Sequence, residues 1–372
     1  MYKKEINVGL VGSGFMGKTH VFGYAIAEKV FNLPIKFNMF KVADINLNKA
    51  KIAKENFGFR HCTEDWRELV DDKEIDLIDI TVPNSMHKDI ALAAIDSGKH
   101  VYCEKPLAPF SKDALEMTKA AEDKKIKTQV GFNYLVNPMF SLAKDIINSG
   151  ELGEIYNFIG IHAEDYMSDK NIEFSFRHEK EGGGVLSDLG SHVVATAEFL
   201  LGPINKVLGD CNTIINKRKD NLGNVKNIEV DDVTNCFLKF KNGAVGTLSA
   251  NWCATGKKMQ HDFEVFGSKG SIKFTQERLN ELMIYNVKDN LKQRGYKKIE
   301  AGPEHFPYGN FCVAPGHQLG FNDLKAIEIA YFADSLLGKK EKFNFRSGYR
   351  IQKIVESILE SSKETSWLTI PY

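Results

Sequence analysis

A glycine-rich turn near the N-terminus constrains this chain more than any other feature. Residues 5–11 have the apolar character of a buried strand, and the turn GSGFMGKT, residues 12–19, follows directly. Its glycines fit G-x-G-x-x-G, which binds dinucleotides, and also the P-loop pattern G-x-x-x-x-G-K-T. Both patterns place backbone N–H groups and a helix N-terminus against phosphate. The turn therefore predicts a phosphate-binding α/β domain but does not choose between the two ligands.

The next predicted strand, residues 37–43, ends at Asp44. A carboxylate at this point can accept hydrogen bonds from an adenosine ribose, whereas a P-loop protein has no need of it. Asp44 lies 27 residues after Gly17, and no Arg or Lys follows it until Lys49. Because no cation adjoins Asp44 to receive a 2′-phosphate, the sequence favours NAD over NADP.

Strands and helices alternate up to about Val130. Residues 75–82 form a predicted strand closed by the segment 83–87. The stretch 101–108 contains another short strand, which carries Lys105 and ends in the Glu104-Lys105-Pro106 turn, and residues 127–132 form the last strand. This alternation predicts a doubly wound parallel sheet, so residues 1–130 are expected to form a Rossmann domain. The Glu-Lys-Pro turn would lie at the carboxyl edge of that sheet, where such folds bind ligands.

The pattern changes after about residue 138. Long alternating strands follow, with turn signals at Lys241-Asn242-Gly243 and at residues 267–270, and with helices near 185–201, 321–337 and 347–362. Residues 131–372 are therefore expected to form an α+β domain that binds substrate and mediates oligomerisation. Its sheet should be large, mixed and mostly antiparallel, and residues 217–227 should form a polar loop.

Residues 182–192, GGGVLSDLGSH, hold the second group of chemically informative side chains. Asp188 and His192 are four residues apart, so a helix would place both on one face. They lie in an apolar run, where a buried Asp and His must be paired for structure or used in catalysis. Gly190 costs a helix about 1 kcal/mol relative to Ala, which indicates that another group, such as a ring or another backbone, approaches closely there.

Taken together, these motifs resemble those of the Gfo/Idh/MocA family (glucose–fructose oxidoreductase, inositol dehydrogenase and relatives) of NAD(P)-dependent oxidoreductases. The G-x-G-x-x-G turn, Glu104-Lys105-Pro106 and G-G-x-x-x-D-x-x-x-H, residues 183–192, occur in the family's order over nearly the whole chain. The resemblance implies that Lys105, Asp188 and His192 form the catalytic set, that the Lys-Pro bond is often cis, and that relatives assemble as dimers or tetramers.

The residue types suit alcohol oxidation. His192 titrates in the range useful for a general base, Asp188 would orient it or bind a neighbouring hydroxyl, and the charge of Lys105 would stabilise a developing alkoxide. No H-x-x-x-H or C-x-x-C spacing supports zinc, so no metal is expected. The expected cofactor contacts are Gly12, Gly14, Phe15, Met16, Gly17, Asp44, Pro83, Asn84, His87, Glu104 and Lys105. The expected substrate contacts are Lys105, Asn133, Tyr134, His162, Asp165, Tyr166, Arg177, Asp188, His192 and His317.

Composition limits the partners. Lys and Arg number 49, as do Asp and Glu, so no basic patch for nucleic acid or membrane is indicated. No apolar stretch reaches membrane-spanning length, and the short apolar run after Lys4 is broken by glycines, so we expect a cytoplasmic protein without a signal peptide. The six cysteines are scattered, as in a reducing compartment. The expected partners are a small sugar or cyclitol and further copies of the chain, as a homodimer or homotetramer.

The sequence thus predicts an NAD-dependent dehydrogenase that oxidises a secondary hydroxyl of a sugar, anhydrosugar or cyclitol. Three alternatives stay open: an NAD-recycling glycoside hydrolase of the same family, a P-loop kinase or NTPase, and a cofactor-binding sensor without catalysis. Relatives often carry an Arg after the Asn133-Tyr134 pair, where this chain has Leu135, so the substrate itself is not specified.

Overall fold

The computed structural model describes residues 4–371 and divides into two compact units. The first contains the chain up to Asn133 together with Gly320–Arg350, and the second contains Tyr134–Leu319 together with the chain from Ile351 onward. The division differs from the expected domains 1–130 and 131–372, because the segment 320–350 belongs to the first unit. Close helix packing explains the difference: a Cβ on Gly23 would lie 2.7 Å from Ile329 Cδ1.

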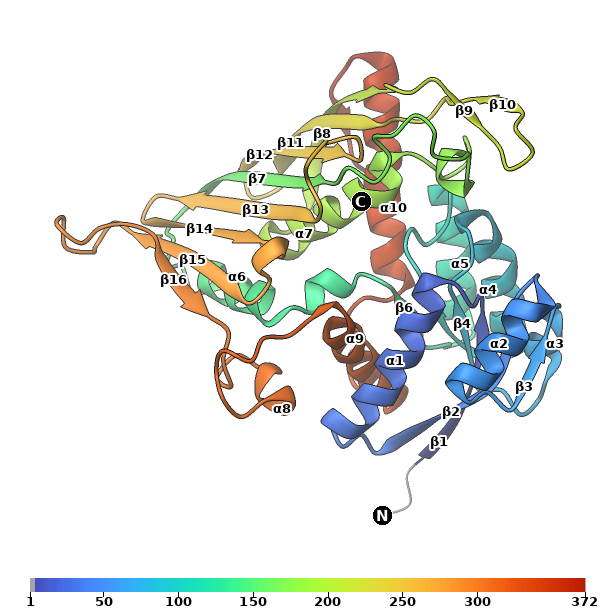
Figure 1. Ribbon diagram of the computed structural model, residues 1–372. Coiled ribbons are helices and arrows are strands. Elements are labelled where there is room, and N and C mark those ends of the chain that lie inside the picture. The colour runs from blue at the N-terminus through green and yellow to red at the C-terminus, as the bar shows by residue number, and fades with distance from the viewer. Residues whose placement is uncertain (1–3, 372) are drawn as a thin grey trace. The chain divides into compact units, whose positions relative to one another are not determined.

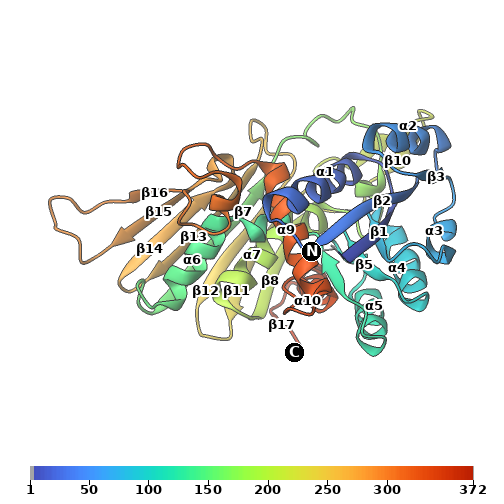
Figure 2. The ribbon, with the colours of Figure 1, turned by 90° about the horizontal axis from the view of Figure 1, so that it is seen from below.

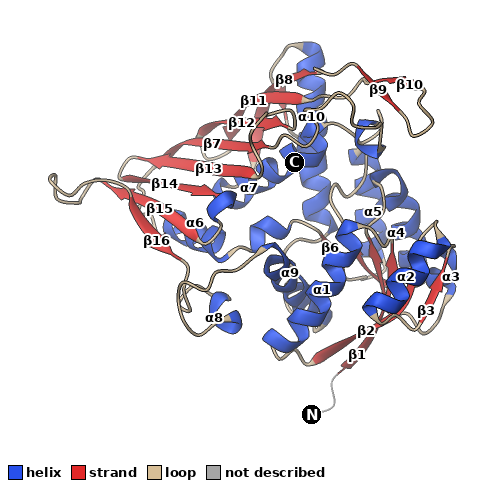
Figure 3. Cartoon of the chain, viewed as in Figure 1, coloured by secondary structure: helices blue, strands red, loops and turns tan. Residues whose placement is uncertain are grey.

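The first unit is built on a six-stranded sheet in the order β3-β2-β1-β4-β5-β6, with every neighbouring pair parallel. This is the 3-2-1-4-5-6 order of dinucleotide-binding folds. Helices cover both faces of this sheet (Figure 1 and Figure 3), and its central strands β4 and β5 are accordingly almost completely buried. The strands are β1 (Lys4–Val11), β2 (Ile35–Ala43), β3 (His61–Thr63), β4 (Leu77–Ile80), β5 (His100–Cys103) and β6 (Thr128–Val130).

The helices of this unit alternate with its strands as predicted, and α9 is added from the C-terminal part of the chain. They are α1 (Phe15–Val30), α2 (Leu47–Phe57), α3 (Arg67–Asp71), α4 (His87–Asp96), α5 (Ser111–Asp123), α9 (Phe321–Leu336) and the start of α10 (Phe345–Glu364). Because β1 lies between β2 and β4, the strand order reverses at β1. The loops that follow these strands surround the point where such sheets bind their ligands.

The second unit contains a nine-stranded mixed sheet in the order β16-β15-β14-β13-β7-β12-β11-β8-β17. Only β7 and β12 pair in parallel among its neighbours, so the predicted mixed, mostly antiparallel sheet is confirmed. The strands are β7 (Ile155–Ala163), β8 (Ile204–Asn212), β11 (Val233–Phe240), β12 (Val245–Asn251), β13 (Gln260–Gly267), β14 (Gly270–Thr275), β15 (Glu281–Asn286), β16 (Lys297–Glu300) and β17 (Leu368–Thr369).

Helices α6 (Pro138–Asn148) and α7 (Ser191–Leu201) cover one face of this sheet, as Figure 2 shows, and the short α8 (Tyr308–Phe311) follows β16. A Cβ on Gly160 of β7 would lie 2.5 Å from Val193 Cγ1, so this glycine allows α7 to approach the sheet. Residues 217–227 are not the polar loop that was predicted, because β9 (Lys217–Lys219) and β10 (Val225–Asn227) form a hairpin. No helix among residues 4–371 is long and apolar enough to span a bilayer.

Candidate active site

Each glycine of the N-terminal turn has a separate steric role. Gly12 has φ +96°, and a Cβ there would lie 2.9 Å from Thr81 O. A Cβ on Gly17 would lie 2.2 Å from Gly12 O, so α1 can start directly against the turn only with glycine at this position. Gly14 has no atom within 4 Å of such a Cβ, so its open backbone is the one a ligand can approach. These are the three roles that a dinucleotide fingerprint requires.

Asp44 lies beside this turn, just past the end of β2. Its Oδ2 accepts hydrogen bonds from Ser13 N at 3.1 Å and Ser13 Oγ at 2.5 Å, and its Oδ1 accepts from Asn46 N at 3.0 Å. Burial acts to raise the pKa of Asp44, but these hydrogen bonds outweigh it and lower the pKa. The carboxylate is therefore ionised, and it retains acceptor capacity for a ribose hydroxyl because a carboxylate has about four acceptor positions.

The Glu104-Lys105-Pro106 turn follows β5, and its Lys105–Pro106 peptide bond is cis, as the resemblance implied. His87 is buried beneath it, with Nδ1 2.9 Å from Pro106 O and Nε2 2.9 Å from Val82 O. Burial lowers the pKa of His87 despite these carbonyl groups. His87 thus joins the end of β4 to the turn after β5, and it supports the loop backbone around the expected nucleotide site.

The other cofactor candidates lie at the same edge of the sheet. Phe15 is 73% exposed, with its ring centroid 6.0 Å from that of Phe321, and Met16 is half-buried. Pro83 and Asn84 are half-buried at the turn after β4. Glu104 is buried and its carboxylate binds side chains of its own unit, so a role in supporting Lys105 fits its surroundings better than a direct cofactor contact.

In the second unit, the glycines before Asp188 allow a tightly packed turn. Gly184 has φ +92°, and a Cβ there would lie 2.1 Å from Asp231 Oδ1. A Cβ on Gly183 would lie 2.3 Å from Glu179 O. Asp231 in turn accepts hydrogen bonds from Leu186 N at 3.0 Å and Thr234 Oγ1 at 2.5 Å. Its buried carboxylate thereby fixes the start of the segment that carries Asp188 and His192.

That segment begins with a wider turn than predicted. Leu186–Gly190 is π-helical, and regular α-helix starts at Ser191. At Gly190 a Cβ would lie 2.7 Å from Leu186 Cδ1 and 3.3 Å from Ala250 Cβ. The close approach expected at this glycine is therefore present, and aliphatic side chains make it. Single π-helical turns within helices are frequent at functional sites.

Asp188 is held by two side chains from preceding loops. Its Oδ2 accepts from Arg177 Nε at 2.9 Å and from Tyr166 OH at 2.7 Å. Burial and the Asp188 charge raise the pKa of Tyr166, so its hydroxyl stays a donor. Burial opposes the charge of Arg177, but Asp188 outweighs it and raises the pKa of Arg177. These contacts bring together three of the residues expected to bind substrate, Asp188, Arg177 and Tyr166.

His192 lies in a cluster of aromatic and imidazole rings. Its ring centroid is 4.7 Å from that of Tyr134 and 5.7 Å from that of His162. His162 Nε2 lies 3.0 Å from Glu164 Oε1, and its ring stacks on His261 at 4.8 Å. Burial, and then the neighbouring His162, lower the pKa of His261 well below its usual value. We refer to Asp188, His192, Tyr166, Arg177 and these rings as the Asp188–His192 cluster.

The remaining substrate candidates have more varied surroundings. Asn133 is buried, and its Nδ2 has no hydrogen-bond partner among the residues described. Asp165 accepts from Lys258 Nζ at 2.7 Å and Gly256 N at 3.1 Å, so it ties two loops together. His317 is exposed in the loop after α8, with Nδ1 3.3 Å from Pro315 O.

The sequence analysis missed several residues that hold these sites. Thr81 Oγ1 donates to Gly12 O at 2.7 Å, and Ser13 binds Asp44. In the second unit, Arg218 is 2% exposed and donates to Met167 O at 2.6 Å and Asp169 O at 2.8 Å, which anchors the loop after Tyr166. Asp231, which fixes the turn before Asp188, was also missed. The one available signal for it was the pair of adjacent acids Asp231-Asp232 directly before a strand with alternating buried residues.

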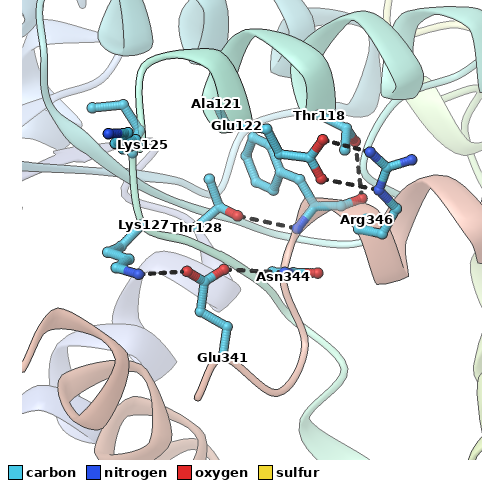
Figure 4. Close-up of a pocket in the computed structure, with 11 residues that line it drawn as sticks. Thr118, Ala121, Glu122, Lys125, Lys127, Thr128, Glu341, Asn344 and Arg346 are labelled. Carbon is cyan, nitrogen blue, oxygen red and sulfur yellow. Dashed lines mark hydrogen bonds and ion pairs between the residues drawn. The ribbon is translucent and has the colours of Figure 1, made fainter. Parts of the chain in front are cut away.

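Two surface pockets of the first unit lie at the opposite, amino edge of its sheet. The one in Figure 4 contains Thr128, where β6 starts, and its charges are paired: Lys127 with Glu341 at 2.9 Å and Arg346 with Glu122 at 3.0 Å. The other contains His100, where β5 starts. Neither includes a predicted site residue. Within residues 4–371, no three His, Cys, Asp or Glu side chains form a group that could hold a metal.

Comparison with protein families identifies both parts of the chain. Residues 6–132 match an oxidoreductase family with an NAD-binding Rossmann fold, and residues 140–273 match the GFO/IDH/MocA C-terminal domain. Levoglucosan dehydrogenase of Pseudarthrobacter phenanthrenivorans is 36% identical over 99% of both chains. Glucose-6-phosphate 3-dehydrogenase of Bacillus subtilis is 25% identical over 98% of both.

Solved structures agree. Levoglucosan dehydrogenase in complex with NADH and levoglucosan superimposes with a TM-score of 0.95 at 36% identity, covering 99% of this chain and 100% of that one. An NAD-binding oxidoreductase from Klebsiella pneumoniae superimposes with a TM-score of 0.94 at 35% identity, covering 99% of this chain and 100% of that one. The P-loop alternative is wrong, because both the strand order and the family model specify a dinucleotide fold. The chain is a member of the Gfo/Idh/MocA family of NAD-dependent oxidoreductases.

Proposed function

We propose that the protein oxidises a secondary hydroxyl of a sugar, anhydrosugar or cyclitol with NAD as the hydride acceptor. The observation that carries this proposal is the Asp188 carboxylate, fixed by Arg177 and Tyr166 on the π-helical turn that leads into His192. A fixed carboxylate and an imidazole on consecutive turns suit binding and deprotonation of a polyol hydroxyl.

The first unit would bind the cofactor through the N-terminal turn and Asp44. The open backbone at Gly14 and the N-terminus of α1 suit the pyrophosphate, and the Asp44 carboxylate suits the adenosine ribose. The ionised Asp44 would also repel a 2′-phosphate, which supports NAD over NADP. Asn133 would use its Nδ2 donor toward a bound ligand.

In this proposal the side chains divide the acid–base work. His192 takes the hydroxyl proton as general base. Asp188, whose charge Arg177 keeps in place, orients the imidazole or accepts a neighbouring hydroxyl. Lys105 stabilises the alkoxide that forms as the proton leaves. Bound NAD supplies the hydride acceptor. Tyr134, His162, Asp165 and His317 are assigned to substrate recognition.

A polyol substrate is supported by the chemistry of the Asp188–His192 cluster and by the relatives. The cluster offers carboxylate, imidazole, phenol and guanidinium groups, which match a ligand rich in hydroxyls. Relatives of this chain include dehydrogenases of levoglucosan, glucose 6-phosphate and scyllo-inositol. Levoglucosan, a compact anhydrosugar, is the first candidate because its dehydrogenase is 36% identical over the whole chain.

We also propose that the protein forms a homodimer or homotetramer through the open face of its nine-stranded sheet. Side chains alternate between faces along a strand, so Ile159 and Phe237 lie on the face opposite Gly160 and α7. They are 40% and 57% exposed, which is unusual for large apolar side chains on central strands. A Phe237→Glu variant should dissociate the assembly, and sedimentation of variant and wild type would test this.

The test of function is a screen for NADH formation with levoglucosan, inositols, hexoses and glucosides, in parallel with His192→Ala. We expect NADH to form with at least one cyclic polyol, and the variant to be nearly inactive with that compound. No NADH with any polyol would contradict the proposal. Release of an aglycone from a glucoside without net NADH would support the glycoside hydrolase alternative.

A further inference from the structure

A buried charge network lies directly beneath the Glu104-Lys105-Pro106 turn, and no step of the proposed chemistry uses it. It joins α1, β4, β5 and α9 within the first unit. Its members are His20, Tyr24, Asp79, Tyr102, Glu104, Lys325 and Glu328, each at most 6% exposed.

His20 is the cationic centre of one side. Its Nδ1 lies 2.9 Å from Asp79 Oδ1 and its Nε2 lies 2.8 Å from Glu104 Oε1. Only the imidazolium form has a donor on both nitrogens. Burial alone would lower the pKa of His20, but the Asp79 charge and the hydrogen bonds to Asp79 and Glu104 outweigh it and raise the pKa. His20 is therefore positively charged between two carboxylates.

Lys325 is the cationic centre of the other side. Its Nζ lies 2.9 Å from Glu104 Oε1, 2.6 Å from Glu328 Oε2 and 2.9 Å from Tyr102 OH. The hydroxyl of Tyr102 also donates to Glu328 Oε2. Glu104 thus faces both cations, whereas Asp79 faces only His20. Burial raises the pKa of Glu328, which can balance the charge by taking a proton.

The network ends at the backbone of Lys105. Glu104 Oε1 receives both cations, while its Oε2 accepts the Lys105 N–H at 3.2 Å. The Glu104 carboxylate lies so close to the chain at residue 131 that only glycine leaves space for it, because a Cβ on Gly131 would lie 2.4 Å from Oε1. The position of the Glu104 carboxylate therefore restrains the backbone from which Lys105 extends.

We propose that Lys325 and His20 are positioning residues for the oxidation: by fixing the Glu104 carboxylate, they fix Lys105. The inference rests on the role proposed above for Lys105. A purely stabilising role would not require such a network, because buried ion pairs can often be replaced by apolar side chains without loss of stability. Lys325 reaches this position because α9 belongs to the first unit, far in sequence from the turn that it supports.

The test compares Lys325→Met and His20→Phe, each of which removes one of the two donors to Glu104 Oε1. Lys99→Met is the matched control. Lys99 is also buried, but its Nζ donates to Asp72 O at 2.6 Å and Ile75 O at 2.8 Å, and it precedes β5, whereas Lys105 follows that strand. Acetylation of Lys105 by acetic anhydride is followed by mass spectrometry with NAD present, alongside steady-state kinetics and thermal unfolding.

In both network variants we expect kcat to fall about tenfold to a hundredfold, because a displacement of a catalytic group by about 1 Å can lower the rate about a hundredfold. KM should stay within about threefold of the wild-type value. The rate of Lys105 acetylation should change about threefold or more. Lys99→Met should leave Lys105 acetylation unchanged. If either Lys325→Met or His20→Phe fails to fold, the remaining variant tests the inference. A folded variant with unchanged Lys105 acetylation overturns the inference. A wild type that reduces no NAD would defeat the proposed function instead, and the acetylation result would still stand.

Discussion

The nucleotide site of the first unit and the Asp188–His192 cluster of the second are held by different kinds of interaction. The nucleotide site depends on backbone that lies close to other backbone: Gly17 against Gly12 O, and Gly12 against Thr81 O. Most of its parts lie within one turn or at the ends of adjacent strands. A short motif can therefore encode it.

The Asp188–His192 cluster depends on charged side chains that reach across long stretches of sequence. Asp231 fixes the turn before Asp188, Arg177 and Tyr166 hold its carboxylate, and Arg218 anchors the loop that follows Tyr166. The contrast suits the two tasks proposed for these sites, because one cofactor is shared by many enzymes whereas substrates differ. A site of separate side chains can change its ligand without a change of backbone.

The largest expected effect separates chemistry from cofactor binding. His192→Ala should lower kcat by about 10²–10⁴, the usual contribution of a general base, and Lys105→Ala should be at least as damaging. NADH affinity, measured by fluorescence titration, should stay near that of wild type for His192→Ala, because the expected cofactor contacts do not include His192. Wild-type turnover in His192→Ala would remove it from the mechanism.

Gly184→Ala tests whether the Asp188–His192 cluster depends on close backbone packing as strictly as the nucleotide site does. The added methyl would meet Asp231 Oδ1 at 2.1 Å, at a residue with φ +92°. We expect the free energy of unfolding to fall by about 2–4 kcal/mol from overpacking and strain. Urea unfolding measures it, and stability equal to wild type would show that Asp231 can move aside.

Asp44→Ala tests the cofactor preference. A carboxylate near a 2′-phosphate costs about 1–3 kcal/mol after screening, so we expect a preference for NAD of about ten- to hundredfold in wild type. The variant should narrow the ratio of kcat/KM values for NAD and NADP. A wild type that prefers NADP, or a ratio that does not change, would show that Asp44 does not face the ribose.

His178 gives the second unit a dependence on pH. Burial, and then the Arg218 charge, lower its pKa to about 4. The unfolded chain takes up this proton near its ordinary pKa of 6.5, so stability is lost as pH falls from there toward the folded pKa. With screening allowed for, the loss by about pH 5 is about 1–2 kcal/mol.

His178→Asn isolates that contribution. Asparagine Oδ1 can replace Nδ1 as the acceptor of the Ser175 N–H, which lies 3.0 Å away, and it does not titrate. Unfolding free energies of both proteins are measured between pH 7 and 5. As pH falls, the unfolding free energy of the wild type should drop more than that of the variant. If the two free energies fall in parallel, His178 is not the cause of the pH dependence.

Gly14→Ala is the counterpart of the Gly184 variant and has the smallest expected effect. Its Cβ would meet no atom within 4 Å, so the melting temperature should not change. NADH binding should weaken by about tenfold, or about 1.4 kcal/mol, because the methyl would stand where the pyrophosphate approaches. A lower melting temperature with normal NADH binding would show that Gly14, like Gly184, is needed for packing and not for the approach of a ligand.

The difference between local backbone packing and contacts of distant side chains also explains which parts of the fold and the site could be predicted from the sequence. The Rossmann sheet and the mixed second sheet follow from local patterns. Asp188, Arg177 and Tyr166 were each named as candidate site residues, but the contact of Asp188 with the other two was not predicted, because the spacing in the sequence paired Asp188 with His192. The placement of α9 could not be predicted, because Lys325 meets Glu104 across more than two hundred residues. Arg218 was missed because it lies in Lys-Arg-Lys, which has the composition of a solvated loop, although its guanidinium is buried. The roles of the site residues stay predictions.

Hydride transfer itself provides the most direct test. The best polyol of the screen is prepared with deuterium at its carbinol carbons and incubated with NAD and the wild-type enzyme, and the nicotinamide of the product is analysed by NMR. We predict one deuterium at the C4 position of each NADH formed. Turnover of the polyol with no deuterium in the NADH pool would contradict direct hydride transfer from substrate to cofactor.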